Sequence, residues 1–149
     1  MWDLPPLPSV DLGATGLRVS RLGLGGFHQV EISSEVVEQV VTAFLEVGGT
    51  YIETARNYGR GASEEKLGRA LEGRRDRVVL ATKVFGVTGE GTNDTGASRY
   101  HIMNGVEASL RRLKSDHIDL YQIHRWDANT PIEETLRALD DLIRQGKVR

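Results

Sequence analysis

The 149-residue sequence contains no cysteine, so it can form neither a disulfide framework nor a thiolate metal site. Its longest apolar runs are far shorter than the roughly 20 residues that a membrane-spanning helix needs. The segment from Met1 to Ser9 lacks both a basic start and an apolar core, which argues against a secretory signal. We therefore expect a cytoplasmic protein with no membrane partner.

Neither sign of charge is in clear excess, because 19 lysines and arginines face 21 aspartates and glutamates. Nucleic acids and anionic membranes attract basic surfaces, so neither is an expected partner. Hydrophobic residues make up 39% of the chain and charged residues 27%, which is typical of a globular domain with a buried core. A small molecule or another protein is the more natural partner.

Proline is scarce, and three of the four prolines (Pro5, Pro6 and Pro8) lie in the first eight residues. Proline fixes φ and has no N–H to donate, so residues 1–9 are predicted to form an extended N-terminal arm. Residues 10–149 would then form the folded domain. From Ser9 to Thr130 the sequence contains no proline that could interrupt a helix or strand.

The folded region begins with a predicted β-hairpin around Thr15-Gly16 and a strand near residues 19–24, which stops at a pair of glycines. Residues 36–45 then show helical spacing of apolar side chains, with Ser33 or Ser34 as the N-cap and Gly48 at the end. A strand followed by a helix is one βα unit.

The same pattern recurs three times, with strands predicted near residues 50–55, 77–84 and 117–124 and a helix after each. The last helix is predicted to begin at a capping box formed by Thr130 and Glu133, with Pro131 at its first position. Four consecutive βα units predict an α/β protein with a parallel sheet and outer helices. An open doubly wound sheet and a closed barrel both fit this pattern.

Ionisable side chains are predicted at the carboxyl end of each later strand: Glu53, Lys83 and His124, with Tyr58 on the loop after the first of them. In parallel α/β proteins this edge of the sheet is where ligands bind. Each of these residues alone would more often be structural or solvated. Their coincidence at one rim is what indicates a site.

These four side chains suit the reduction of a carbonyl group. A phenol is a poor proton donor near neutral pH, and a neighbouring ammonium such as Lys83 stabilises the phenolate form. A carboxylate such as Glu53 would keep that lysine charged, and His124 could hydrogen-bond the substrate oxygen. The hydride would have to come from another molecule.

Six segments, taken in order, are similar to one known family: "LGATGLRVSRLGLGG", "YIETARNYG", "SEEKLGRAL", "LATKV", "ASLRRLKSDHIDLYQIHRWD" and "TPIEETLRALDDLIRQGKVR". From about Val10 to the last residue the sequence resembles the aldo-keto reductases. Within that family, these segments are most similar to the bacterial type that also resembles potassium-channel β subunits.

The resemblance implies the first four βα units of a (β/α)8 TIM barrel, preceded by the short hairpin. It also implies reduction of aldehydes and ketones with NADPH, without excluding NAD. In this family pattern Tyr58 matches the proton donor, Lys83 the lysine that activates it and His124 the histidine that orients the carbonyl. Glu53 stands where the family has aspartate, and its extra methylene displaces the carboxylate by roughly 1.5 Å, one C–C bond.

The same resemblance places Gly26 and Phe27, together with Glu53, against the nicotinamide side of the cofactor. Gly23 and Gly25 do not make a dinucleotide fingerprint, because His28 replaces the third glycine. The histidines show no metal-binding spacing, so no metal is expected.

Loop 85–98 carries four glycines and is either a flap over the pocket or a solvated loop. Trp126 is either a wall of the pocket or a packing residue.

A (β/α)8 barrel takes about 250 residues, so the sequence is expected to be truncated and to lack the family's main contacts with the cofactor. Exposed sheet edges would favour self-association. Three functions therefore stay open: a carbonyl reductase, a non-catalytic fragment or degenerate reductase, and a regulatory cofactor-binding protein.

Overall fold

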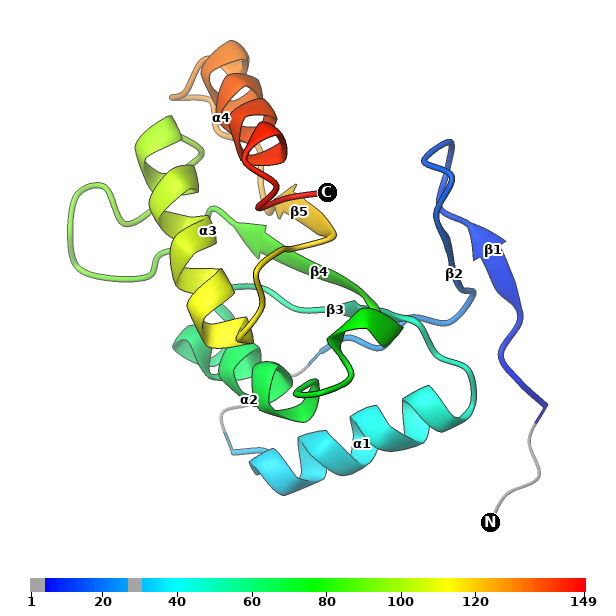
Figure 1. Cartoon of the computed structure of the whole chain (residues 1–149). Helices are drawn as coiled ribbons and strands as arrows, with labels where there is room; N and C mark the ends of the chain where they lie inside the picture. The colour runs from blue at the N-terminus through cyan, green and yellow to red at the C-terminus, as the bar shows by residue number, and fades with distance from the viewer. Residues whose placement is uncertain (1–4, 27–30) are drawn as a thin grey trace.

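The computed structural model describes residues 5–26 and 31–149 (Figure 1). Two short strands form a hairpin, and a three-stranded sheet with its helices follows. The elements are, in order, β1 (Ser9–Asp11), β2 (Arg18–Ser20), α1 (Ser34–Glu46), β3 (Tyr51–Glu53), η1 (Tyr58–Gly61), α2 (Ala62–Ala70), η2 (Arg75–Arg77), β4 (Val79–Val84), α3 (Arg99–Leu113), β5 (Leu120–Ile123) and α4 (Ile132–Arg144).

Strands β3, β4 and β5 lie side by side in chain order and are all parallel. Single parallel bridges extend this order at both edges, from Leu24 to Ile52 and from Ile118 to Val148. The helices also pack on one another in chain order, α1 on α2, α2 on α3 and α3 on α4 (Figure 1). Winding in one direction, with no reversal of strand order, is the arrangement of a partial barrel and not of a doubly wound sheet.

The predicted N-terminal hairpin is present, with β1 and β2 antiparallel. The strand predicted over residues 19–24 is shorter than expected, because β2 ends at Ser20 and pairing resumes only at Leu24. The Ser20 hydroxyl donates to the Leu22 carbonyl at 2.7 Å, which turns the chain between the two pairings. Ser20 and Thr50 also exchange two hydrogen bonds, of 2.8 and 3.0 Å, which fix the hairpin to the start of β3.

The two faces of the sheet differ because successive side chains of a strand point to opposite sides. On the helix side, Ile52, Leu80, Val84 and Tyr121 are buried in the core. On the opposite side Tyr51, Glu53, Val79, Lys83 and Gln122 are only half-buried. This second face corresponds to the inside of the barrel, and Glu53 and Lys83 lie on it.

Ser33 caps α1 as predicted, because its hydroxyl accepts from the Val36 N–H. Ser98, for which no cap was predicted, begins α3 in the same way by accepting from the His101 N–H. The capping box predicted for α4 is wrong. The hydroxyl of Thr130 donates to the carboxylate of Asp127 at 2.8 Å instead, and α4 begins at Ile132. The Asp127 carboxylate, which also accepts the N–H groups of Ala97 and Asn129, competes successfully for that hydroxyl.

Helix α2 is joined to α3 and β4 by a buried charge. Glu64 is fully buried, and its carboxylate accepts from the Thr82 hydroxyl at 2.6 Å and pairs with Arg112 at 2.6 Å. One turn later Gly68 lets the two helices approach closely, because a Cβ there would lie 2.4 Å from the Arg112 carbonyl oxygen. A buried carboxylate needs such complete pairing, and the close approach supplies it.

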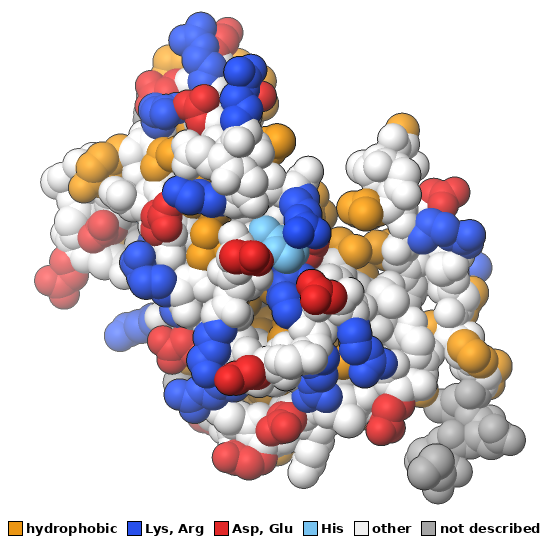
Figure 2. Space-filling view, viewed as in Figure 1, with side chains coloured by type: hydrophobic (Ala, Val, Ile, Leu, Met, Phe, Trp, Pro, Cys, Tyr) orange, Lys and Arg blue, Asp and Glu red, His pale blue; other side chains and the backbone are white. Residues whose placement is uncertain are grey.

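The surface shows no zone of one charge sign on the face that Figure 2 presents, where acidic and basic side chains alternate. Within residues 5–26 and 31–149, no helix combines the length and the apolar character needed to cross a membrane.

The contact between α2 and α3 generates a stability prediction. Gly68→Ala should lower the free energy of unfolding by about 1–3 kcal/mol, because the new methyl group overlaps backbone atoms of α3. Glu65→Ala, at an exposed position of the same helix, should change it by less than about 0.5 kcal/mol. Urea unfolding of both variants measures the difference, and equal stabilities would contradict the close packing.

Candidate active site

The register of the parallel strands places the polar side chains at one end of the sheet. Glu53 lies opposite Ala81 of β4, and Lys83 lies opposite Gln122 of β5. Beyond the end of β5, the His124 N–H continues the ladder by donating to the Val84 carbonyl at 2.8 Å. Glu53, Lys83 and His124 therefore reach the same rim from three neighbouring strands.

Tyr58 reaches this rim on a tight turn. Its N–H donates to the Ala55 carbonyl at 3.0 Å, and the next three residues, Gly59, Arg60 and Gly61, have φ values of 57°, 55° and 98°. Three consecutive left-handed residues reverse the chain sharply, and glycine at two of them removes most of the steric cost. The turn thus holds Tyr58 close to the end of β4.

Lys83 is the centre of the cluster. Its ammonium contacts the Glu53 carboxylate and donates to the Tyr58 hydroxyl at 3.1 Å and to the Thr54 carbonyl at 3.0 Å. It also lies 4.8 Å from the centroid of the Tyr58 ring. The ring of His124 meets the Tyr58 ring edge-on, with 5.8 Å between centroids. The fold therefore brings together all four side chains that the sequence singled out.

Glu53 fits beside Lys83 because the residue that faces it is a glycine. Gly25 follows the single bridge between Leu24 and β3. A Cβ on Gly25 would lie 2.8 Å from the second carboxylate oxygen of Glu53. Gly25 therefore leaves the space that the longer acid occupies. This accommodation explains how a glutamate reaches the lysine at a position where the resemblance led us to expect aspartate.

Two residues expected at the cofactor lie on the segment after Leu24. Gly26 has φ of 90°, a conformation that favours glycine. Phe27 lies outside the described residues, so its predicted role against the nicotinamide stays a prediction.

Comparison with known proteins identifies the family. The aldo/keto reductase family matches residues 21–149 of this chain. The chain belongs to the aldo/keto reductase family.

The chain is similar to a probable voltage-gated potassium channel subunit beta from Oryza sativa subsp. japonica, with 38% identity over 143 residues. That alignment covers 91% of this chain and 43% of the rice protein. A protein of the same description from Arabidopsis thaliana has the same identity and coverage. The chain therefore spans less than half of the length of these curated relatives.

A solved structure has the same arrangement. The holo form of aldo-keto reductase AKR11C1 from Bacillus halodurans has 36% sequence identity to this chain and superposes with a TM-score of 0.87. The match covers 96% of this chain and 48% of that one. It confirms the fold predicted from sequence, a partial reductase barrel with an N-terminal hairpin.

The environment of Lys83 changes its pKa in two opposite ways. Burial lowers the pKa of Lys83 from its ordinary 10.5 to about 8. The adjacent Glu53 carboxylate acts in the opposite direction, since an anion in contact favours the ammonium. With a pKa of about 8, Lys83 loses its proton at a lower pH than an ordinary lysine does.

Beside the cluster, a pocket of about 240 Å³ is formed by residues of three loops. It is lined by Asn57, Phe85, Gly86, Val87, Thr95, His124 and Arg125. Sequence reasoning missed Asn57 and Phe85. Phe85 has φ of 140°, a conformation that non-glycine residues rarely adopt, and such strain often marks a functional site. No sequence pattern could have revealed that backbone angle.

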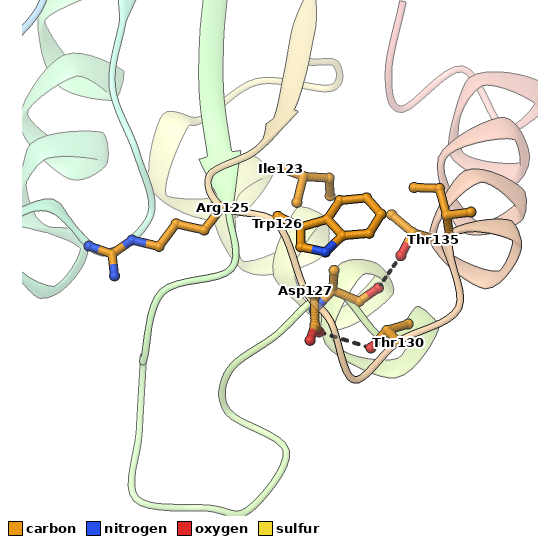
Figure 3. A pocket seen from close by; sticks show the side chains of 8 residues that line it. Ile123, Arg125, Trp126, Asp127, Thr130 and Thr135 are labelled. Atoms are coloured by element: carbon orange, nitrogen blue, oxygen red, sulfur yellow. Dashed lines mark hydrogen bonds between the residues drawn. The ribbon is translucent and has the colours of Figure 1, made fainter.

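Trp126 belongs to a different pocket, of about 180 Å³, between the end of β5 and α4. The side chain is 73% exposed and lies on the side of Thr130 and Thr135, whereas Arg125 points the opposite way (Figure 3). The tryptophan thus lines a pocket, beside and not within the one that contains His124.

The pKa of Lys83 generates a prediction about pH. Between about pH 8 and 10.5 the folded protein holds fewer protons on Lys83 than the unfolded chain, so raising the pH through this window stabilises the fold. This contribution is complete above 10.5 and is lost as the pH falls through about 8.

The measurement is urea unfolding of the parent and of Lys83→Met across this window. The parent should gain stability relative to the variant as the pH rises, and the subtraction removes the effect of other titrating groups. A difference that does not change with pH would contradict the lowered pKa.

Proposed function

We propose that this chain contributes the catalytic half of an NADPH-dependent carbonyl reductase, in which Tyr58 gives the proton to the carbonyl oxygen of an aldehyde or ketone. The observation that carries the proposal is the contact of the Lys83 ammonium with the Glu53 carboxylate and its 3.1 Å hydrogen bond to the Tyr58 hydroxyl. Family membership supports the same chemistry.

The residues divide the proton transfer between them. Lys83 stabilises the phenolate that forms when Tyr58 releases its proton, and Glu53 stabilises the charged lysine. The His124 ring, edge-on to Tyr58, can hydrogen-bond the same carbonyl oxygen and orient it. The nicotinamide cofactor, when bound, supplies the hydride.

The rim has the character that a nicotinamide ligand requires. Among the described residues, Asn57 Oδ1 and Gln122 Oε1 are buried acceptors without a hydrogen-bond partner. Gln122 lies opposite Lys83 in the register of β4 and β5, and Asn57 precedes Tyr58 and lines the pocket beside the cluster. Buried acceptors of this kind suit a ligand that carries N–H or O–H groups. Gly26 and Glu53 are the described residues that we assign to the cofactor side, for either NADPH or NAD.

We infer that residues 10–149 act as one unit and that four further βα units complete the pocket. They would come from a longer protein or from a second copy of the chain. The similarity to the probable potassium channel β subunits of plants favours a second candidate, a regulatory subunit that binds the cofactor. Cofactor binding without turnover would distinguish that function from the reductase.

Tyr58→Phe tests the proton donor. The variant should bind NADPH like the parent but reduce an aldehyde about 10²–10⁴ times more slowly, the range that general acid catalysis contributes. NADPH fluorescence measures binding, and NADPH absorbance measures turnover. Equal rates in variant and parent would remove Tyr58 from the mechanism, and failure of the parent to bind NADPH would favour the non-catalytic fragment.

Substitutions at Glu53 test whether its charge or its length matters. Because Gly25 provides space and Glu53 already contacts Lys83, Glu53→Asp should change turnover by less than about tenfold. Glu53→Gln keeps the length but removes the charge, and should cost about a hundredfold or more. A large gain in Glu53→Asp would instead show that the longer side chain misplaces the lysine, as expected for a degenerate site.

A further inference from the structure

A buried arginine lies on the helix side of the sheet, on the face opposite to Glu53 and Lys83. Arg56 is only 8% exposed, and its guanidinium donates to the Thr88 hydroxyl at 3.1 Å and lies 3.3 Å from Nε2 of His101. Its Nε has no hydrogen-bond partner. Within residues 5–26 and 31–149, no carboxylate oxygen lies within 4.0 Å of this guanidinium.

Both of its partners are uncharged. Nδ1 of His101 lies 2.9 Å from the Asn93 carbonyl oxygen, which can only accept, so that nitrogen carries a proton. Nε2 is then left to accept from Arg56, which requires a neutral imidazole. Consistently, burial and the neighbouring Arg56 lower the pKa of His101. A buried cation with neutral partners is costly unless an anion compensates it.

The chain makes room for this guanidinium. A Cβ on Gly105 of α3 would lie 2.6 Å from one of the Arg56 terminal nitrogens and 2.9 Å from the Tyr121 hydroxyl. Glycine at this position therefore provides the space for the arginine between α3 and β5.

The Arg56 side chain lines a pocket of about 590 Å³, which we call the Arg56 pocket. It is lined by Arg56, Arg60, Val87, Thr88, Gly89, Glu90, Asp94 and Arg112. This volume lies in the range of small-molecule sites, about 300–1,000 Å³.

The three arginines of the pocket are not equivalent. Arg112 is neutralised by Glu64 at 2.6 Å. Arg60 is exposed, and neither it nor Arg56 forms an ion pair with any residue in the described ranges. Two carboxylates, Glu90 and Asp94, also line the pocket. Asp94 accepts the Gly91 N–H at 2.8 Å and interacts with Arg56 only beyond ion-pair distance. Arg56 and Arg60 are thus guanidiniums with no carboxylate oxygen within 4.0 Å among the described residues.

We propose that the Arg56 pocket binds the phosphate group of a small organic phosphate, held between the guanidiniums of Arg56 and Arg60. The planar guanidinium presents paired N–H donors that match phosphate oxygens. The pocket is much larger than a phosphate ion, so the rest of it accepts the organic part of the ligand. The Arg56 side chain packs against α3, whereas Lys83 and Tyr58 lie on the inner rim. The Arg56 pocket therefore adjoins the pocket beside Lys83, with Val87 lining both, but its arginines are not part of the proposed carbonyl site.

The test is calorimetric titration of the 149-residue chain with glycerol 3-phosphate, with inorganic phosphate and succinate as the comparison anions. The parent should bind glycerol 3-phosphate with a Kd below about 1 mM. Arg60→Gln should weaken binding at least about tenfold, equivalent to 1.4 kcal/mol. Arg137→Gln, at an exposed position of α4, should leave it unchanged.

Arg56→Lys keeps the charge but loses the paired donors, so it should also weaken binding. Tyr58→Phe should bind as the parent does, which separates this site from the proposed reductase function. No saturable binding up to about 10 mM, ten times the expected Kd, would overturn the proposal. So would equal affinity in parent and Arg60→Gln, or tighter binding of succinate than of glycerol 3-phosphate.

Discussion

A partly buried ammonium at the end of β4 is the constraint on which the rest of the site depends. Lys83 loses hydration at this position, and its charged form persists only because a carboxylate, a carbonyl and a phenol oxygen surround it. Those oxygens come from the end of β3 and the turn after it. The register between β3 and β4 and the left-handed turn at residues 59–61 must therefore both be correct before the cluster can form.

The helix side of the sheet supports this arrangement with a second set of charges. Glu64, Thr82 and Arg112 join α2, β4 and α3, and Gly68 lets the two helices approach closely. The alternation of side chains along β4 places Thr82 towards the helices and Lys83 towards the barrel interior. A single strand thus anchors the scaffold on one face and presents Lys83 on the other. The Arg56 pocket lies at the edge of the same scaffold, where loop 85–98 leaves and rejoins it.

Much of the fold was accessible from sequence because apolar periodicity reports burial directly. The four repeated units and the positions of Glu53, Lys83 and His124 at strand ends follow from that periodicity, and the cap at Ser33 follows from a serine just before the helical pattern. The capping box at Thr130 failed because a hydroxyl chooses among acceptors in space, and Asp127 offers a better one. The strand predicted over residues 19–24 was too long, because the alternation of apolar and polar residues does not reveal the turn that Ser20 makes with Leu22.

The sequence by itself determined the class of fold, the family and the identity of the four polar residues at one rim, because spacing and residue type are properties of the chain alone. The tertiary structure decided which side chains are in contact and which backbone conformations they impose. The space that Gly25 leaves for Glu53, the strained backbone of Phe85 and the burial of the Arg56 guanidinium beside His101 all depend on the folded chain. Such contacts depend on how strands and helices are placed against one another, and local patterning carries no record of that placement.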